Sequence, residues 1–217
     1  MIECKDFLEP SITLVATFLG AWLAFRFERK NKKDEEEQRQ CGAANQALCT
    51  LFSLWSNTEQ YRKEAIEPCR GKPDAWLNMS AQTPIKTGLA SFEAGSLSFL
   101  LQTPTPMIYP ELFLEEQHFA ELINKIEWHF TILMNDVFPR FAAAGVNVGA
   151  PLPLLEIERI IGNDVAHKLR GITKALESSV DENLKTLVSV HDRLYGAMKQ
   201  LYPKRKFVKA DFHAHAS

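Results

Sequence analysis

The sequence predicts an all-α protein with an N-terminal single transmembrane helix that continues into a charged stalk and a cytoplasmic helical bundle. Three observations predict this fold class. One uninterrupted apolar run lies near the N-terminus, three later segments carry apolar residues at spacings of three and four, and strand-like alternation is almost missing. No period of about 20 to 50 residues repeats, so we do not expect an array of repeats.

The apolar run covers residues 7–27, FLEPSITLVATFLGAWLAFRF, and has no charged side chain from Pro10 to Phe25. A helix needs about 17 to 25 residues to cross a hydrocarbon core of about 30 Å. Apolar residues cover the whole circumference of this helix, whereas an amphipathic helix would leave a polar stripe. We therefore expect residues 1–27 to form a membrane anchor. A buried core helix of a soluble domain is the alternative.

Basic residues directly after the run predict its orientation. The cluster consists of Arg26, Arg29, Lys30, Lys32 and Lys33. Only Lys5 precedes the run, so the positive-inside rule places the N-terminus outside and the rest of the chain in the cytoplasm, at a bacterial inner (plasma) membrane. The cluster is also a candidate site for anionic headgroups. A cleaved signal peptide carries its positive charges before the apolar region, so we expect an uncleaved anchor.

Small residues recur every four positions within the predicted anchor, at Ala16, Gly20 and Ala24. This spacing places them on one face, where small side chains allow two helix backbones to approach closely. The pattern predicts a homo-oligomer that assembles through the anchor. The alternative is that small residues are simply common in membrane helices.

Length and composition restrict the other classes. A chain of 217 residues has room for the anchor and one domain of ordinary size. The net charge of −2 and the pI near 6.3 give no reason to expect a nucleic-acid partner. The four cysteines, Cys4, Cys41, Cys49 and Cys69, form no CxxC motif, and we expect reduced thiols on the cytoplasmic side.

Residues 28–40, ERKNKKDEEEQRQ, predict a solvated helical stalk in which opposite charges four apart, such as Lys32 and Glu36, form pairs. The cytoplasmic domain is expected to cover residues 41–203. It begins with a helix over about 41–65, whose apolar stripe is Ala44, Leu48, Leu51, Leu54, Trp55 and Tyr61. A loop over 68–84 follows, with Trp76 and Leu77 pinning it to the core.

The second half of the domain predicts two long helices. Residues 96–101, SLSFLL, fit either a helical turn or a short strand. One helix starts near Pro110, ends near Pro139 and carries the stripe Phe119, Leu122, Ile123, Ile126, Phe130, Leu133 and Val137. After a small-residue linker over 142–153, the chain is expected to be helical from 154 nearly to 202, with Asn163 or Asp164 as an N-cap. The tail, 204–217, is expected to be extended.

Few residues are candidates for chemistry. His191 replaces an apolar residue in the stripe of the last helix, so it is a candidate buried switch that responds to pH. Glu115 and His118 supply one Glu-x-x-His motif, but di-iron bundles need this motif on two helices. His213 and His215 lie in the tail, which cannot by itself hold closed metal geometry. Phosphate-loop, HExxH and GxSxG motifs do not occur, so we predict no catalytic residue, metal site or cofactor.

These observations predict a non-enzymatic, single-span inner-membrane protein that self-associates and senses or binds a cytoplasmic protein partner through its helical domain. In its sharper form the chain is a membrane-perturbing effector of stress or phage (antiviral) defence, since a short, close-packing anchor can thin a bilayer. One alternative is a membrane-tethered scaffold or adaptor. Another is a metal-dependent helical-bundle enzyme, motivated by the acid and histidine residues over 115–129.

Overall fold

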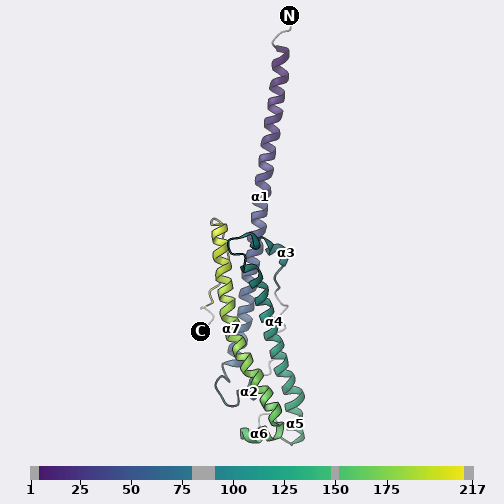
Figure 1. The fold of residues 1–217 in the computed structure, drawn as a ribbon, viewed down its shortest axis with the longest axis vertical. Helices are drawn as coiled ribbons and strands as arrows, with labels where there is room; N and C mark the ends of the chain where they lie inside the picture. Colours follow the sequence, from purple (N-terminus) through teal and green to yellow (C-terminus); the bar gives the residue numbers. More distant parts are fainter. Residues whose placement is uncertain (1–4, 80–90, 148–151, 213–217) are drawn as a thin grey trace. The chain divides into compact units, whose positions relative to one another are not determined.

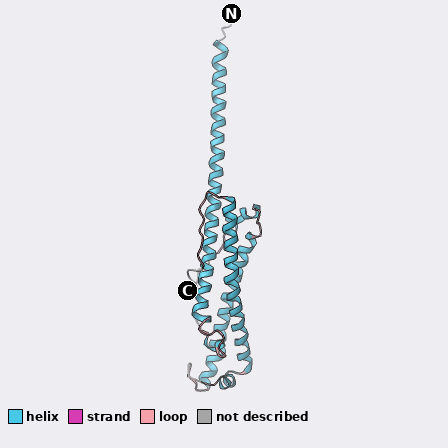
Figure 2. Cartoon of the chain, turned by 90° about the vertical axis from the view of Figure 1, so that its left-hand side faces the viewer, coloured by secondary structure: helices cyan, strands magenta, loops and turns pink. Residues whose placement is uncertain are grey.

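The computed structural model describes residues 5–79, 91–147 and 152–212, and for residues 5–16 it describes the helix but not the side chains. Every regular element in these ranges is helical, which confirms the all-α class (Figure 2). In chain order the elements are α1 (Lys5–Tyr61), a π-helix (Arg62–Ile66), α2 (Ala75–Asn78), α3 (Ala94–Leu97), a 3-10 helix (Ser98–Gln102), α4 (Ile108–Ile132), a π-helix (Leu133–Val137), α5 (Phe138–Ala143), α6 (Leu154–Ile161) and α7 (Asn163–Leu201).

The chain divides into two compact units, residues 1–43 and 44–217. The first unit contains the beginning of α1, where large apolar side chains are exposed, from Phe18 (71%) to Phe27 (63%). Among residues with described side chains, no helix is apolar enough over a sufficient length to cross a membrane. The predicted span begins at Phe7, and its residues up to Ala16 lie outside that searched part. The transmembrane anchor therefore stays a prediction.

The charged stretch of the first unit is helical, as predicted, but one of its ion pairs differs. Lys32 pairs with Glu28 at 2.7 Å rather than with Glu36, which accepts hydrogen bonds from Arg39 and Gln40. A glutamate four residues before a lysine is the more favourable arrangement on a helix, because it complements the helix dipole. Lys32 has acids on both sides, and this preference agrees with the choice of Glu28.

The second unit is a bundle of three long helical segments: α1 from Ala44 onward, α4 and α7 (Figure 1). α4 packs along α7. The predicted stripe of α1 is fully buried, and the α4 stripe is buried except for the half-buried Ile123 and Phe130. On α7 the predicted stripe is buried except for the half-buried Leu184 and the exposed Leu201. Its residues are Val165, Leu169, Ile172, Leu176, Val180, Leu184, Leu187, His191, Leu194, Met198 and Leu201. Helical periodicity thus identified the faces that form this core.

The helix that was expected to end near Pro139 continues through it to Ala143. The π-helix Leu133–Val137 closes with the Phe138 N–H donating to the Leu133 carbonyl, and Pro139 then lies in the first turn of α5. A proline in a first turn needs no N–H donor, and its fixed φ suits the helix start. The wide π-turn therefore removes the reason for the helix to stop there.

The predicted continuous helix from residue 154 is broken at Gly162 into α6 and α7. Gly162 has φ +84° and ψ 146°, and it is the N-cap of α7, with no side-chain cap from Asn163 or Asp164. A residue with a side chain would be strained at this φ, and its Cβ would lie 2.8 Å from Arg140 Nη1 and 2.8 Å from Asp164 Oδ1, so both of those side chains would have to shift. The Arg140 guanidinium donates instead to the Ile161 carbonyl at the end of α6.

The connections also resolve two predictions. Residues 96–101 are helical, in α3 and the 3-10 helix, so the strand alternative is wrong. The expected loop after residue 68 contains the short helix α2, which contacts α7. Trp76 pins it as predicted, since the side chain is 3% exposed and its indole N–H donates to the Pro73 carbonyl at 3.0 Å. Leu77 is half-buried against the same core.

Candidate functional site

A groove of about 700 Å³ lies in the second unit, between the end of its α1 segment and the middle of α7. Its wall combines an apolar part and a charged part. The lining residues are Trp55, Glu59, Arg62, Glu67, Arg70, Asp181, Leu184, Lys185, Val188 and Phe212. They come from α1, the first π-helix, the turn after it, α7 and the C-terminal tail.

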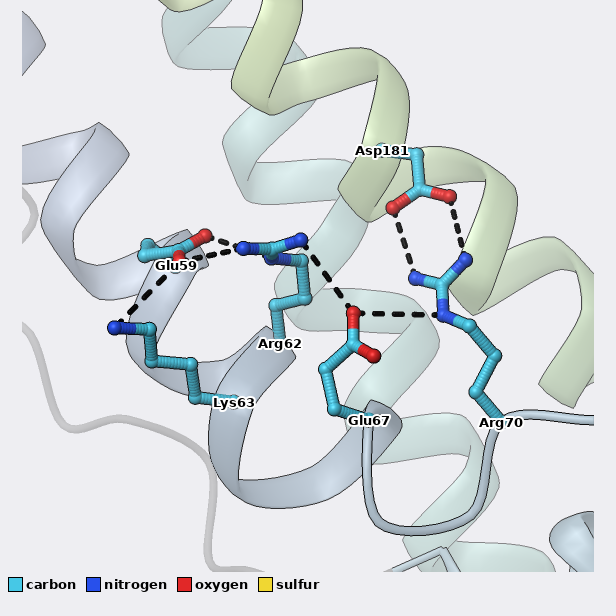
Figure 3. Close-up of polar contacts among 6 residues, drawn as sticks. All are labelled: Glu59, Arg62, Lys63, Glu67, Arg70 and Asp181. Atoms are coloured by element: carbon cyan, nitrogen blue, oxygen red, sulfur yellow. Dashed lines mark hydrogen bonds and ion pairs between the residues drawn. The ribbon is translucent and has the colours of Figure 1, made fainter. Parts of the chain in front are cut away.

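The charged part of the wall is one connected ion-pair network (Figure 3). The Arg62 guanidinium donates to both carboxylate oxygens of Glu59 at 2.7 Å, and its Nη1 lies 3.4 Å from Glu67 Oε1. Arg70 Nε lies 3.6 Å from the same Glu67 oxygen. The other two nitrogens of Arg70 donate to Asp181 at 2.8 and 2.9 Å. Glu67 therefore links two arginine–carboxylate pairs into a chain of charges.

Burial and charge explain the electrostatics of this network. The side chain of Glu59 is only 6% exposed, so its charge depends on Arg62 for compensation. Hydrogen bonds from Arg70 hold the pKa of Asp181 below its usual value. The carboxylates in turn raise the pKa values of Arg62 and Arg70. Lys63 adds a weaker contact to the network, since its Nζ lies 4.0 Å from Glu59 Oε1.

Lys185 differs from the two arginines of the groove. It is exposed on α7, one helical turn after Asp181, and no ion pair within 4.0 Å involves it among the described residues. Asp181 is already held by Arg70, so the Lys185 ammonium is available to a ligand. An ammonium beside an apolar wall is complementary to an apolar group that carries one acid.

The apolar part of the wall is built around Phe212. This ring is 7% exposed and meets Trp55 edge-on, with centroids 5.2 Å apart, and Phe52 at 6.0 Å. Edge-to-face aromatic pairs at such distances are favourable beyond their buried area. Leu184 and Val188, both half-buried, continue the apolar surface along α7. The end of the tail is therefore part of the groove.

His191 lies behind this aromatic cluster and is fully buried, as its place in the stripe predicts. Its Nδ1 lies 3.3 Å from Asp192 Oδ1, and its Nε2 accepts the Ala210 N–H at 3.4 Å. The ring packs perpendicular to Phe212, with centroids 4.8 Å apart. Burial lowers the pKa of His191, although Asp192 opposes the effect, so the neutral ring is favoured. Its role as a switch stays a prediction.

Glu115 and His118 lie in a separate polar layer between α4 and α7. Glu115 is 3% exposed and accepts a hydrogen bond from the Thr186 hydroxyl at 2.8 Å, while His118 Nδ1 is 3.8 Å from its other oxygen. Burial raises the pKa of Glu115. No third ligand joins the two: among the described residues no group of three His, Cys, Asp or Glu side chains could hold a metal ion.

The remaining residues of the acid and histidine cluster do not converge on this layer. His129 is buried, and its Nε2 lies 3.3 Å from the Trp76 carbonyl, to which it can donate. Glu121 and Glu127 are exposed on α4. The tail histidines His213 and His215 lie outside the described residues. The arrangement therefore brings together one acid–histidine pair and no larger constellation.

The candidate sites in the first unit are exposed where their side chains are described. Gly20 has no atom within 4 Å of the position of an added Cβ, Ala24 is exposed, and Ala16 lies outside the described side chains. In the basic cluster, the guanidinium of Arg26 lies 5.3 Å from the Trp22 ring centroid, and that of Arg29 lies 4.4 Å from the Phe25 centroid. Arg26, Arg29, Lys30, Lys32 and Lys33 are all exposed.

The cysteines show no catalytic arrangement in the described residues. Cys41 and Cys69 are buried and Cys49 is exposed, and none of the three forms a disulfide, while Cys4 lies outside the described part. The Cys69 thiol donates to the Asn78 carbonyl at 3.3 Å, and burial raises its pKa. A raised pKa keeps a thiol protonated and weakly nucleophilic. Cys69 is thus a structural residue of the loop that carries α2.

Sequence reasoning did not find the groove. The spacing of Glu59 and Arg62 does match a helical ion pair, and that signal was present in the chain. Nothing in one sequence, however, indicates that Arg70 meets Asp181 or that Phe212 returns to Trp55. Comparisons with protein-family models, with curated proteins and with solved structures found no match to this chain.

Proposed function

We propose that the chain is a non-enzymatic, single-span inner-membrane protein that self-associates through its anchor and binds a protein partner through the groove of its helical domain. The groove carries this proposal. An apolar wall at Trp55, Leu184 and Val188 with the unpaired Lys185 beside it fits an amphipathic helix of a partner that presents apolar side chains and one acid. The domain faces the cytoplasm in this proposal.

The exposed apolar surface of the first unit supports the anchor. Phe18, Leu19, Trp22, Leu23, Phe25 and Phe27 are between 45% and 71% exposed on one helix. Apolar side chains of this kind are favourable in the hydrocarbon core of a bilayer. In soluble proteins, large exposed apolar surfaces mark interaction sites. Trp22 and Phe25 beneath the guanidinium groups of Arg26 and Arg29 resemble the aromatic and basic residues found at a membrane interface.

Crosslinking of the full-length protein in native membranes tests the anchor. Gly20→Leu places a bulky side chain on the small-residue face, whereas Phe18→Leu changes the opposite face and serves as the matched control. We expect a ladder of oligomers for the wild type and for Phe18→Leu, and its loss for Gly20→Leu. Recovery of the wild-type protein in the soluble fraction, or an unchanged ladder in Gly20→Leu, would contradict the proposal.

A photocrosslinking amino acid at position 188 tests the groove in cells that make the full-length protein. We expect one dominant adduct, which Lys185→Glu abolishes by placing an acid against the partner's acid. Lys174→Glu is the matched control, because Lys174 is exposed on the same helix but outside the groove. An adduct that survives Lys185→Glu, or no adduct at all, argues against a partner in the groove.

The sharper form of the proposal is an effector of stress or phage defence that raises membrane permeability when the groove is occupied. A short anchor with a close-packing face could cluster and thin the bilayer. Inducing the chain while following membrane potential tests this form, with Gly20→Leu as the control. Depolarisation that requires Gly20 supports it, and a normal potential throughout infection and stress rejects it.

The groove also favours a second function, a membrane-tethered adaptor that recruits its partner without perturbing the bilayer. Purification in detergent separates the two functions. An adaptor should copurify with one stoichiometric partner as a monomeric unit, while an effector should copurify mainly with further copies of itself.

A further inference from the structure

The tail after α7 forms a strap, residues 203–212, which begins with a turn and is bonded to the helices near both of its ends. At its beginning, Lys199 Nζ donates to the carbonyls of Pro203 and Arg205 at 3.4 and 3.1 Å. Further along, the Asn45 side chain accepts the Val208 N–H at 2.9 Å and donates to the Lys206 carbonyl at 3.4 Å. These two hydrogen bonds to the strap's backbone hold it against the second unit's segment of α1.

In the last part of the strap, the Ala210 N–H donates to His191 Nε2 at 3.4 Å. Because the Ala210 N–H donates to Nε2, that nitrogen carries no proton, and the proton of the neutral ring is assigned to Nδ1, facing Asp192. Two residues later, Phe212 packs on the His191 ring and closes the aromatic cluster with Trp55. One nitrogen atom thus connects a buried histidine to a wall of the groove.

We propose that the strap is a gate on the groove, that neutral His191 holds it shut, and that a proton on His191 Nε2 opens it. The proton comes from solvent and replaces the lone pair that accepts the Ala210 N–H, so two donors then face each other. The strap end leaves with Phe212, and the Trp55 side of the groove becomes accessible. This inference rests on the groove being the binding site, and it adds a regulation of that site by acid.

The charges around the histidine set the direction of the gate. Asp192 on α7 favours the protonated ring, and Lys209 on the strap opposes it. The α1 side of Phe212 contributes the uncharged rings of Phe52 and Trp55. Burial of the ring outweighs Asp192 and lowers its pKa, so the gate is shut at neutral pH. Opening returns the ring to solvent, and each pKa unit between the two states shifts the shut–open ratio about tenfold.

The released strap would differ in charge from the groove that it leaves. It carries Lys204, Arg205, Lys206 and Lys209 against the single acid Asp211. The charge of Lys209 opposes a charge on His191, so repulsion between the two cations adds to the loss of the hydrogen bond once the ring is protonated. Both effects of acid favour release of the strap.

The test follows the strap end directly and needs no partner. The full-length protein in detergent carries 4-fluorophenylalanine at position 212, and its fluorine spectrum is recorded from pH 8 to pH 5 at about half-unit steps, spanning the usual histidine range. We expect one resonance at neutral pH and a second, solvent-exposed resonance that grows on acidification. Ala210→Pro removes the N–H donor and should show the exposed resonance already at pH 8.

Two glutamine variants assign the transition. His191→Gln keeps an oxygen that can accept the Ala210 N–H but does not titrate, so the shut resonance should persist in acid. His129→Gln removes the other buried histidine of the bundle and should leave the transition in place. A transition that persists unchanged in His191→Gln, or a shut resonance in Ala210→Pro, overturns the gate. If the fluorine transition occurs but position 188 gives no adduct at any pH, the strap responds to acid while the groove's proposed function fails. If an adduct forms equally at every pH, the groove binds its partner and the gate is overturned.

Discussion

Arg70 donates two parallel hydrogen bonds to Asp181, Nη1 to Oδ2 at 2.8 Å and Nη2 to Oδ1 at 2.9 Å. The pair joins the turn after the first π-helix to the middle of α7. Both side chains are more than a third exposed, 36% and 39%, so water screens their attraction. The planar, two-bonded geometry supplies the specificity, because it fixes the turn at one orientation against α7 and with it one wall of the groove.

A double-mutant cycle of Arg70→Ala and Asp181→Ala should give a coupling free energy of about 0.5 to 1 kcal/mol, at the upper end of exposed pairs because of the bidentate geometry. Urea unfolding at low and high salt measures it, and salt should weaken the coupling. Lys72→Ala is the control, because Lys72 lies two residues after Arg70 and forms no ion pair within 4.0 Å among the described residues. A coupling indistinguishable from zero at low salt would show that the pair has no energetic role.

Arg62→Ala should destabilise the bundle more than Arg70→Ala does. Glu59 is 6% exposed in its side chain, and removing Arg62 leaves this carboxylate buried without its two hydrogen bonds. Stranding a buried acceptor costs about 1 to 3 kcal/mol. The added substitution Glu59→Gln should recover part of that loss, because the buried charge is then gone. If Arg62→Ala and Arg70→Ala lose equal stability, burial of Glu59 is not the decisive factor.

The interior of the bundle was predictable because the helical spacing of apolar residues identifies the buried face of each helix. Leu48, Leu51 and Leu54 on α1 and Leu169 and Leu176 on α7 are all buried, as their spacing indicates. Breaks and ends were harder. From the sequence, Pro139 indicates the end of a helix. In the structure a π-turn precedes it, so that Pro139 lies in the first turn of α5, and no residue pattern predicts a π-turn.

The groove could not be predicted because its members meet only through tertiary structure. Trp55 looked like one more core residue, and Phe212 belonged to a tail expected to be merely extended. In the structure the described part of the tail, residues 204–212, contacts Asn45 and places Phe212 against Trp55. His191 was singled out by its polarity within an apolar stripe, whereas its partner Ala210 has no side-chain signal, because the contact uses a backbone N–H.

Gly162→Ala should destabilise the protein by about 1 to 3 kcal/mol, the cost of holding a side chain in a backbone region reserved for glycine. Its φ is +84°, and the added Cβ would meet Arg140 Nη1 and Asp164 Oδ1 at 2.8 Å. Gly171→Ala is the matched control within α7: its Cβ would meet no atom within 4 Å. There alanine should stabilise the helix by about 0.5 to 1 kcal/mol. Thermal unfolding of both variants should therefore shift in opposite directions.

The free energy of unfolding should fall as pH is lowered from about 7.5 to 5, because burial lowers the pKa values of His191 and His129. The unfolded chain binds protons on these rings from about pH 6.5 downward, whereas the folded chain resists them, so stability is fully present above that pH and is lost below it.

Glu115 acts oppositely, since burial raises its pKa and its charge is the unfavourable form. Urea unfolding across this range in the Glu115→Gln background therefore isolates the histidines. His129→Gln should flatten the slope, since glutamine can still donate to the Trp76 carbonyl without titrating. A slope that is unchanged when both histidines are replaced would assign the acid sensitivity to other groups.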